Sequence, residues 1–517
     1  MDVDASQYAE MSFGMMKTGD FLHLYDRGFD YLDKPPFLFW VSALSMKIFG
    51  ANNFGYKFPS ILFALWALYA TYRLTKLLYN DKTARIAALV LATCQGMYLM
   101  TNDVRCDTIL MSWVITAIWL VQEWIQQKKL LFLLGGCMAM AFGMMTKGPI
   151  ALMVPVFCFL SDWILKREWK NFLQPYYIFG LIIIAILLIP MSIGLYQQYD
   201  AHPEKHISGL RFFFWSQSFG RITGESPWKN GADMSFLLLN MLWSFLPWIF
   251  IFVTALVVNT GTLIKQKMKL QPSQEWLSTG GFILTYLSLG SSGYQLPHYI
   301  FVAFPLASIV TGVFIAKMTE EEQYRKLNKF FTPFYVVLTG LLLVAMVVLI
   351  TWSFPAGIYV IIVCVFCIGI WLRVVFYRNN EKLLSVTVVG MLIVNVFLTN
   401  HVYKPLLGYQ VGNMAGRYVR EHNIDAKEII AYKMHDPIVA MNFYAQGVIP
   451  LADTMTTIGN RKYVLTMDDG LEEIKKQYRY SVLYSGKLFK VSELTPEFIN
   501  PKTRDKEVKN YYIIKLD

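Results

Sequence analysis

The sequence predicts a polytopic α-helical membrane protein that ends in a small soluble α/β domain. Three observations support this fold class. Hydrophobic residues make up 55% of the 517 residues and charged residues only 16%, with a mean hydropathy of +0.40. Long apolar stretches recur along the chain, and the loops between them alternate between basic and mixed polar composition. Such a composition is typical of proteins with many transmembrane helices.

Twelve apolar segments are candidate transmembrane helices, because a helix needs about 20 mostly apolar residues to cross the hydrocarbon layer. Three of them, at 83–101, 130–147 and 149–165, are short, so their ends are the least defined. The candidates lie near 58–79, 83–101, 106–126, 130–147, 149–165, 176–196, 236–259, 275–292, 298–317, 331–352, 355–377 and 382–400.

Lysine and arginine gather in six alternate connections between these segments, and the positive-inside rule places such loops in the cytoplasm. The net charge of +11 therefore follows from membrane topology and needs no nucleic-acid partner. These connections follow the first, third, fifth, seventh, ninth and eleventh segments and include Arg73, Lys128, Lys166, Lys265, Arg325 and Arg378.

The other loops are predicted on the extracytoplasmic face, where we expect the functional site. They are 102–107, 146–148, 197–235 and 294–299, with the first segment 1–57 and the tail 402–517 on the same face. The transmembrane domain is expected at 58–401. A polar N-terminal segment on this face needs a preceding helix to carry it across, so we expect one further upstream helix, which raises the count to thirteen.

The tail alternates between predicted strands and helices, as small α/β domains do. It has no glycine-rich phosphate loop and no nucleophile motif. A role in covering the functional face and a purely structural role therefore both stay open. Strands are predicted at Lys427–Met434, Lys462–Met467, Ser481–Tyr484 and Tyr511–Lys515, and helices at Pro437–Gln446 and Asp468–Tyr478.

An ordered set of motifs occupies the first segment. Asp4 lies four residues before Tyr8-Ala9-Glu10, then come Gly19-Asp20-Phe21 and Tyr31-Leu32-Asp33-Lys34-Pro35-Pro36. This order and spacing resemble the first loop of the GT-C glycosyltransferases that use polyprenyl-phosphate sugars, in the branch of lipid A aminoarabinose transferase and the protein O-mannosyltransferases. The family's Asp-Glu pair is Asp4-Ala5 here, which favours Asp4 as the acid. Asp2 is the alternative if the register is shifted.

The resemblance continues downstream over about residues 1–400. A polar loop ends in Asp107-Thr108, a short span ends in Thr146-Lys147-Gly148, and Gln295-Leu296-Pro297-His298-Tyr299 enters a later span. Gln295 stands where the family has a lysine, so one expected phosphate-facing charge is missing.

The resemblance implies a GT-C fold and the transfer of one sugar from a polyprenyl (undecaprenyl) phosphate, with inversion, to a hydroxyl or phosphate of lipid A, a glycan or a protein. Such a transfer needs a base for the acceptor proton and cations for the departing phosphate. Asp4 is the expected base and Asp107 the second catalytic acid. The expected phosphate ligands are Lys34, Lys147, Arg221 and Arg211, and the expected groove residues are Tyr31, Asp33, Asp103, Gln295 and His298.

Each of these residues also has a structural interpretation. Asp4 and Asp107 are suited to cap the helices that follow them. Lys34 and Lys147 are suited to snorkel at the membrane interface. The aromatic and cationic residues of 197–235 are typical of an amphipathic helix in the interface, and His298 and Tyr299 of interfacial packing. A divalent metal ion held by Asp4 and Asp107 is a further alternative, since one carboxylate pair does not specify a metal site.

Three other functions compete with the transferase. A transporter would place ionisable residues near the bilayer midplane, but here they gather at span ends. A membrane scaffold would leave the first-segment motifs unexplained, and an O-antigen ligase would carry a large late loop. We therefore expect a bacterial inner-membrane glycosyltransferase with its active site and tail on the periplasmic face.

Overall fold

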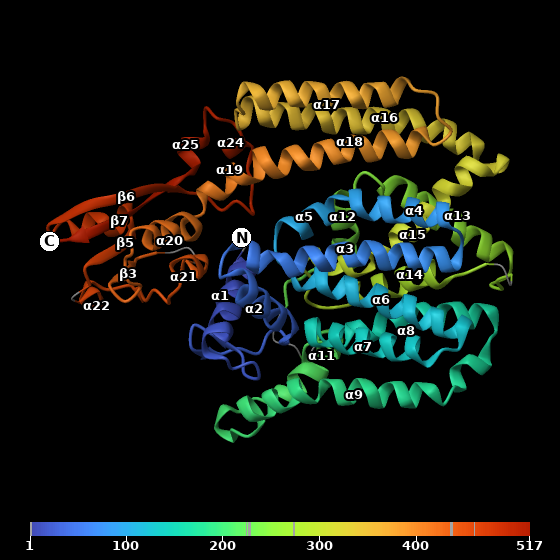
Figure 1. Ribbon diagram of the computed structural model, residues 1–517, viewed down its shortest axis with the longest axis horizontal. Helices are drawn as coiled ribbons and strands as arrows, with labels where there is room; N and C mark the ends of the chain where they lie inside the picture. Colours follow the sequence, from blue (N-terminus) through green and yellow to red (C-terminus); the bar gives the residue numbers. More distant parts are fainter. Residues whose placement is uncertain (1–2, 224, 226–228, 272–273, 435–437, 460) are drawn as a thin grey trace.

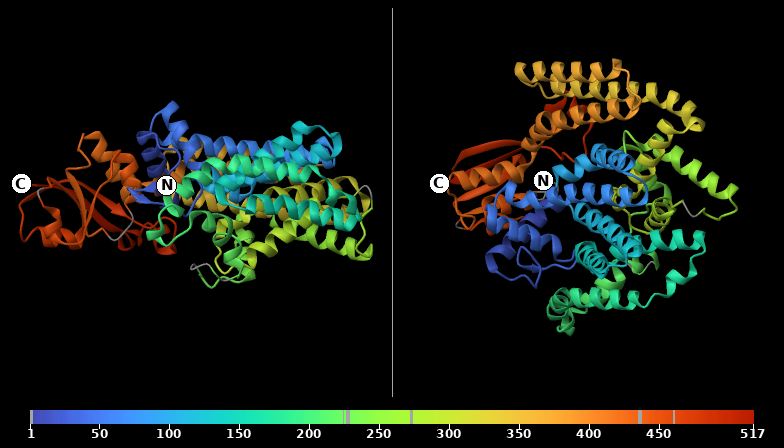
Figure 2. Two further views of the ribbon diagram at one scale, coloured as in Figure 1. Left: turned by 90° about the horizontal axis from the view of Figure 1, so that it is seen from below. Right: turned by 45° about the vertical axis from the view of Figure 1, so that its right-hand side comes forward.

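The structure is a computed structural model of residues 1–517, and it describes all of them except 1–2, 224, 226–228, 272–273, 435–437 and 460. A bundle of long helices forms one part of the molecule, and a mixed α/β domain lies beyond one end of the bundle in each view (Figures 1 and 2). The first segment of the chain lies at that same end (Figure 1).

The helices of the bundle coincide with the twelve apolar segments, but not all are long enough to count as spans. Within the described residues, eight helices are long and apolar enough to cross a membrane, or nine if the bent pair α4 and α5 is one span. The bundle helices are α3 (Asn53–Leu78), α4 (Asp81–Thr93), α5 (Gln95–Asn102), α6 (Cys106–Gln127), α7 (Leu130–Lys147), α8 (Ile150–Lys166), α9 (Tyr176–Leu195), α12 (Met234–Ser244), α13 (Ile249–Lys265), α14 (Leu277–Gly290), α15 (Phe304–Glu320), α16 (Arg325–Val348), α17 (Ile358–Phe376) and α18 (Lys382–Leu398).

Breaks in the helices explain why fewer helices are long enough to span a membrane than the twelve segments predicted. The predicted segment 83–101 bends by 60° between α4 and α5. The segment 236–259 is interrupted between α12 and α13 at Phe245–Trp248, where Pro247 follows a cis peptide bond. Because proline donates no backbone hydrogen bond, it favours such an interruption. Local hydropathy alone does not reveal these breaks.

The first segment folds into helix α1 (Val3–Thr18), a two-stranded hairpin of β1 (Tyr25–Asp26) and β2 (Phe29–Asp30), and helix α2 (Phe37–Phe49). The hairpin turn uses positive φ angles of 53° at Arg27 and 87° at Gly28, as two-residue hairpin turns require. The chain then runs through Lys34 into Pro35-Pro36, which precede α2.

The segment after α9 does not form one interfacial helix. It consists of η2 (Tyr196–Asp200), η3 (Pro203–Lys205), α10 (Gly209–Arg211), η4 (Phe212–Ser216) and α11 (Phe219–Thr223). A break at Gln217-Ser218 separates η4 from α11, so the side chains of the two pieces need not share one face.

The tail has the predicted α/β composition. Its sheet has the order β4-β3-β5-β7-β6, in which β3 pairs in parallel with β4 and β5, and β7 pairs antiparallel with β5 and β6. Its elements are α20 (Val411–Glu421), β3 (Ile429–Tyr432), α21 (Val439–Ala445), β4 (Leu451–Ala452), α22 (Met455–Ile458), β5 (Tyr463–Met467), α23 (Asp468–Ile474), β6 (Tyr480–Leu488), α24 (Pro496–Ile499), α25 (Arg504–Glu507) and β7 (Lys509–Leu516).

The tail packs directly on the first segment. Phe443 of α21 contacts the rings of Phe13 and Tyr56, and Tyr444 Oη donates to Asn53 Oδ1 at 2.8 Å. Tyr56 Oη in turn donates to Ala5 O at 2.6 Å, next to Asp4. The tail therefore braces the helix that carries the candidate base.

Candidate functional site

Three of the four predicted phosphate ligands meet at one cavity of about 90 Å³. Lys34 comes from the first segment, Lys147 from the end of α7, and Arg221 from α11. We call this space the cation cavity. Its other lining residues are Gln217, Ser218, Ser288, Ser292 and Tyr299, with the apolar Leu110, Ile150, Met153, Leu289 and Val302.

Lys34 is presented by an extended stretch between the hairpin and α2. Its Nζ lies 2.5 Å from Asp33 Oδ2, and the Asp33 side chain is 40% exposed. Burial lowers the pKa of Lys34, but the neighbouring Asp33 carboxylate offsets burial, so the net shift is upward. The ammonium group is therefore charged at neutral pH.

Lys147 is the last residue of α7. Its Nζ lies 2.5 Å from Asp107 Oδ1, in the first turn of α6, and 4.1 Å from the centroid of the Tyr299 ring. Gly148 follows with a φ of 95°, a conformation that suits glycine and lets the chain turn away from α7. Lys147 is thus neither exposed nor snorkelling, because a buried carboxylate and an aromatic face hold it.

Arg221 reaches the cavity from α11. Its Nη1 donates to Tyr299 Oη at 2.9 Å, and its guanidinium carbon lies 5.4 Å from the Tyr294 ring centroid. Tyr299 consequently contacts both Lys147 and Arg221. We had assigned Tyr299 to interfacial packing, whereas the structure places it in the wall of the cation cavity.

The candidate base, Asp4, does not line the cation cavity. Asp4 lies inside the first turn of α1 and is partly buried, so it does not occupy the capping position before the helix. Burial is the largest cause that raises the pKa of Tyr31, and the charges of Asp33, Cys106 and Asp4 add to it. The Asp4 charge thus acts on Tyr31 through space. The alternative acid, Asp2, is outside the described residues.

A chain of polar contacts connects the two remaining predicted acids, Asp103 and Asp107. Arg105 Nη2 lies 3.8 Å from Asp103 Oδ2, and Arg105 Nη1 lies 3.3 Å from His298 Nδ1. His298 Nε2 lies 3.7 Å from Asp107 Oδ2. Asp107 therefore faces both the Lys147 ammonium group and the His298 ring, an arrangement that favours a role in holding these two side chains over acid–base chemistry of its own.

Arg211 and Gln295 are also absent from the lining of the cation cavity. Arg211 is 72% exposed and 3.6 Å from Glu225, on the η4 side of the break in its segment. Gln295 is fully buried and donates to Gly290 O at 2.8 Å and Ser292 O at 3.1 Å, so it closes a turn after α14. Neither lines the cavity.

No group of three His, Cys, Asp or Glu side chains is placed to hold a metal ion in the part of the chain that the structure describes. Asp4 and Asp107 therefore belong to no such group of three among the described residues.

Gln217 and Ser218 were missed by the sequence analysis. Both line the cation cavity, and Gln217 Nε2 donates to the backbone O of Asp33. The sequence feature that could have indicated Gln217 is its position four residues before Arg221, in a stretch rich in aromatic residues. Polar residues in such stretches are too common for this signal to be decisive.

Comparison with known proteins bears on the fold of the chain. The sequence model of the family described as dolichyl-phosphate-mannose-protein mannosyltransferase matches residues 33–193. The crystal structure of ArnT from Cupriavidus metallidurans bound to undecaprenyl phosphate superposes with a TM-score of 0.71, covering 98% of this chain and 93% of that one at 16% identity. The chain has the GT-C glycosyltransferase fold and resembles ArnT.

Several sequence relatives of the chain carry one name. This chain is 24% identical over 494 residues to undecaprenyl phosphate-alpha-4-amino-4-deoxy-L-arabinose arabinosyl transferase 1 of Pseudomonas fluorescens (strain Pf0-1). The match covers 92% of this chain and 81% of the relative. The transferase of the same name from Edwardsiella ictaluri (strain 93-146) is 27% identical over 327 residues, covering 62% of this chain. The match spans only 56% of the length of the Edwardsiella protein. These relatives are bacterial proteins named as transferases of an undecaprenyl phosphate sugar. The long apolar helices of this chain indicate a multi-pass membrane protein.

Proposed function

We propose that this chain moves one sugar from an undecaprenyl phosphate or similar polyprenyl phosphate to an extracytoplasmic acceptor, with inversion at the anomeric carbon. The observation that carries the proposal is the convergence of Lys34, Lys147 and Arg221 on one cavity. These cations come from three segments far apart in the sequence, so the convergence is a property of the fold. The names of the relatives, which act on undecaprenyl phosphate sugars, agree with it.

The geometry suits the departure of a phosphate. As the bond between sugar and phosphate breaks, negative charge grows on the phosphate oxygens, and fixed cations lower the energy of that charge. Lys34 contributes a point charge, and the guanidinium of Arg221 is suited to bind two oxygens at once. Tyr299 orients both Lys147 and Arg221 through its ring and hydroxyl group.

Asp4 is the proposed general base. It lies in α1, and its charge acts on Tyr31, which is three residues before Lys34. The proposal therefore has the acceptor bind between α1 and the donor phosphate. Removal of the acceptor proton by a carboxylate needs no covalent intermediate, which agrees with inversion. Tyr31, Asp33 and Asp103 are proposed to line the groove for the sugar and acceptor.

The periplasmic orientation of this site is part of the proposal. The basic connections predict the cytoplasmic side. Lys34, Lys147, Arg221 and the tail belong to the opposite loops, so donor, acceptor and tail would meet on the periplasmic face.

Sugar transfer by the membrane-embedded protein tests the proposal. Radiolabelled polyprenyl-phosphate sugars are offered with lipid, glycan and protein fractions, and the labelled fraction identifies the acceptor. Asp4→Asn should abolish transfer, while the matched acid-to-amide change Glu204→Gln, at an exposed site, should leave it unchanged. Transfer that persists in Asp4→Asn would remove Asp4 as the base. Absence of transfer from every donor by a folded wild-type protein would favour a transporter.

A further inference from the structure

Two buried glutamines bind the chain segment that carries Lys34, and the reaction proposed above gives neither of them a role. Gln198 lies in η2 and is 6% exposed, and Gln217 lies between η4 and α11 and is 9% exposed. Both line a second small cavity together with Tyr31 and Lys34. They belong to the extracytoplasmic segment that follows α9.

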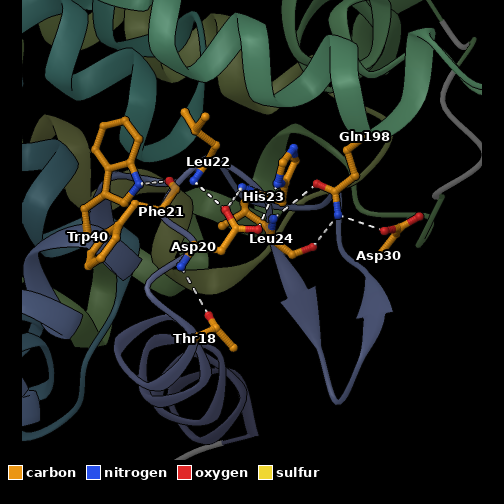
Figure 3. Close-up of polar contacts among 9 residues, drawn as sticks. All are labelled: Thr18, Asp20, Phe21, Leu22, His23, Leu24, Asp30, Trp40 and Gln198. Carbon is orange, nitrogen blue, oxygen red and sulfur yellow. Dashed lines mark hydrogen bonds and ion pairs between the residues drawn. The ribbon is translucent and has the colours of Figure 1, made fainter.

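The Gln198 side chain binds the main chain of Leu24 and the side chain of Asp30, at the two ends of the hairpin. Its Nε2 donates to Leu24 O and to Asp30 Oδ1, each at 2.8 Å, and its Oε1 accepts from Leu24 N at 3.1 Å (Figure 3). Leu24 O also accepts from Tyr31 N at 2.9 Å. Both amide hydrogens of Gln198 are thus used, and its side chain holds Leu24, which precedes β1, and Asp30 of β2 to η2.

Lys205 completes this contact from η3. Its Nζ lies 2.5 Å from Asp30 Oδ2 and 2.6 Å from Gln198 O. Burial raises the pKa of Asp30, but the hydrogen bonds from Lys205 and Gln198 outweigh burial and keep that pKa below its ordinary value. The Asp30 carboxylate is therefore ionised at neutral pH, and the contact persists there.

Gln217 acts at the next point along the same segment. Its Nε2 donates to Asp33 O, the carbonyl immediately before Lys34. Its Oε1 lies beside the turn after Lys147, since a side chain added at Gly148 would meet that oxygen at 3.8 Å. Gln217 therefore lies between the two lysine-bearing segments and also lines the cation cavity.

These contacts define the path of the main chain from Leu24 to Lys34, and Pro35 restricts the residue before it. We infer that Gln198 and Gln217 are positioning residues that clasp residues 24–34, so that Lys34 Nζ faces the donor phosphate in the cation cavity. The inference rests on the proposed function, because the phosphate is the group that Lys34 would meet. Without these hydrogen bonds from Gln198 and Gln217, the Lys34 side chain would stay charged but would no longer be held in an orientation facing the phosphate.

A double-mutant cycle between Gln217 and Lys34 tests the inference, with affinity for undecaprenyl phosphate as the readout. Gln217→Met keeps the size of the side chain and removes its donor. It should weaken binding about tenfold in the wild-type background, but by less than about twofold in Lys34→Met, because a positioning residue has nothing left to position there. Gln198→Met should behave in the same way.

The control is Gln95→Met, at a glutamine that bonds Asn395 and lies outside both cavities. It should bind undecaprenyl phosphate as the wild type does. If Gln217→Met fails to fold, Gln217→Asn takes its place, since it keeps the amide and shortens its reach.

The outcomes separate the two proposals. Equal losses from Gln217→Met in both backgrounds would overturn the inference and show a merely structural role. Unchanged binding in Gln217→Met, alongside weakened binding in Lys34→Met, would overturn it as well. Wild-type binding by Lys34→Met, or no binding by the folded wild type, would contradict the proposed function and the inference together.

Discussion

Lys34 and Lys147 line the same cavity, and each has a carboxylate oxygen 2.5 Å from its Nζ, yet their surroundings differ. Asp33 is adjacent in sequence and 40% exposed, so water can solvate it when Lys34 turns to another anion. Asp107 is only 4% exposed and also faces His298. A phosphate that displaced Asp107 from Lys147 would leave a buried carboxylate without its counter-ion.

The difference indicates a division of labour between the two lysines. Lys34 has an exchangeable partner and is suited to bind the incoming phosphate directly. Lys147 neutralises the buried Asp107 carboxylate, and its positive charge still contributes to the electrostatic potential in the cation cavity. The distance between the ammonium nitrogen and the carboxylate oxygen is the same in the two ion pairs, whereas the exposure of the carboxylate differs.

The largest expected effect comes from Lys147→Met. Removing one partner of a buried ion pair leaves the other charge uncompensated, which costs roughly 3–5 kcal/mol of stability. Thermal unfolding in detergent should therefore show a marked fall in Tm. The double variant Lys147→Met with Asp107→Asn should recover much of that loss. An unchanged Tm in the single variant would show that Asp107 is not held by Lys147.

Lys34→Met should leave Tm close to that of the wild type, since its partner Asp33 is half exposed. It should lower sugar transfer about 100-fold, a magnitude typical of removing one group that stabilises transition-state charge. Initial rates at several donor concentrations check this. Transfer within about twofold of wild type would reverse the roles assigned to the two lysines.

Glu10 offers a buried carboxyl group without a lysine. Burial is the main cause that raises the pKa of Glu10 to about 7, and the Asp26 charge adds to it. Because the folded pKa lies above the unfolded value, this carboxyl group lowers the stability as pH rises from about 4.5 to about 7, and above that pH the loss stays constant. Glu10→Gln should therefore raise Tm by a few degrees at pH 8 and leave it nearly unchanged at pH 4.5. An equal gain at both pH values would exclude titration of Glu10 as the cause.

Arg221 and Arg211 give the smallest predicted effects. They lie ten residues apart in one segment, but Arg221 lines the cation cavity and Arg211 is exposed beside Glu225. Arg221→Met should lower transfer about tenfold, because one charge-assisted contact to phosphate is lost. Arg211→Met should change it less than about twofold, since an exposed ion pair contributes little. Equal effects in parallel rate measurements would contradict this placement.

The sequence was sufficient to predict the helical bundle, the tail and the segments that supply the cations. The basic loops and apolar lengths defined the bundle, and the first-segment motifs pointed to Lys34 and Asp4. It favoured Arg221 over Arg211 but kept both as phosphate ligands, because the break at Gln217-Ser218 could not be predicted from local sequence. It also did not reveal Gln198, Gln217 or Tyr299, whose roles arise from contacts between segments distant in sequence.

The most direct test of the central claim is the structure of this protein bound to undecaprenyl phosphate, determined by electron cryo-microscopy. We predict density for the phosphate in the cation cavity, within hydrogen-bonding distance of Lys34 and Arg221, with Lys147 still paired to Asp107. A phosphate bound elsewhere, with Lys34 still on Asp33 and the cavity unchanged, would contradict the account.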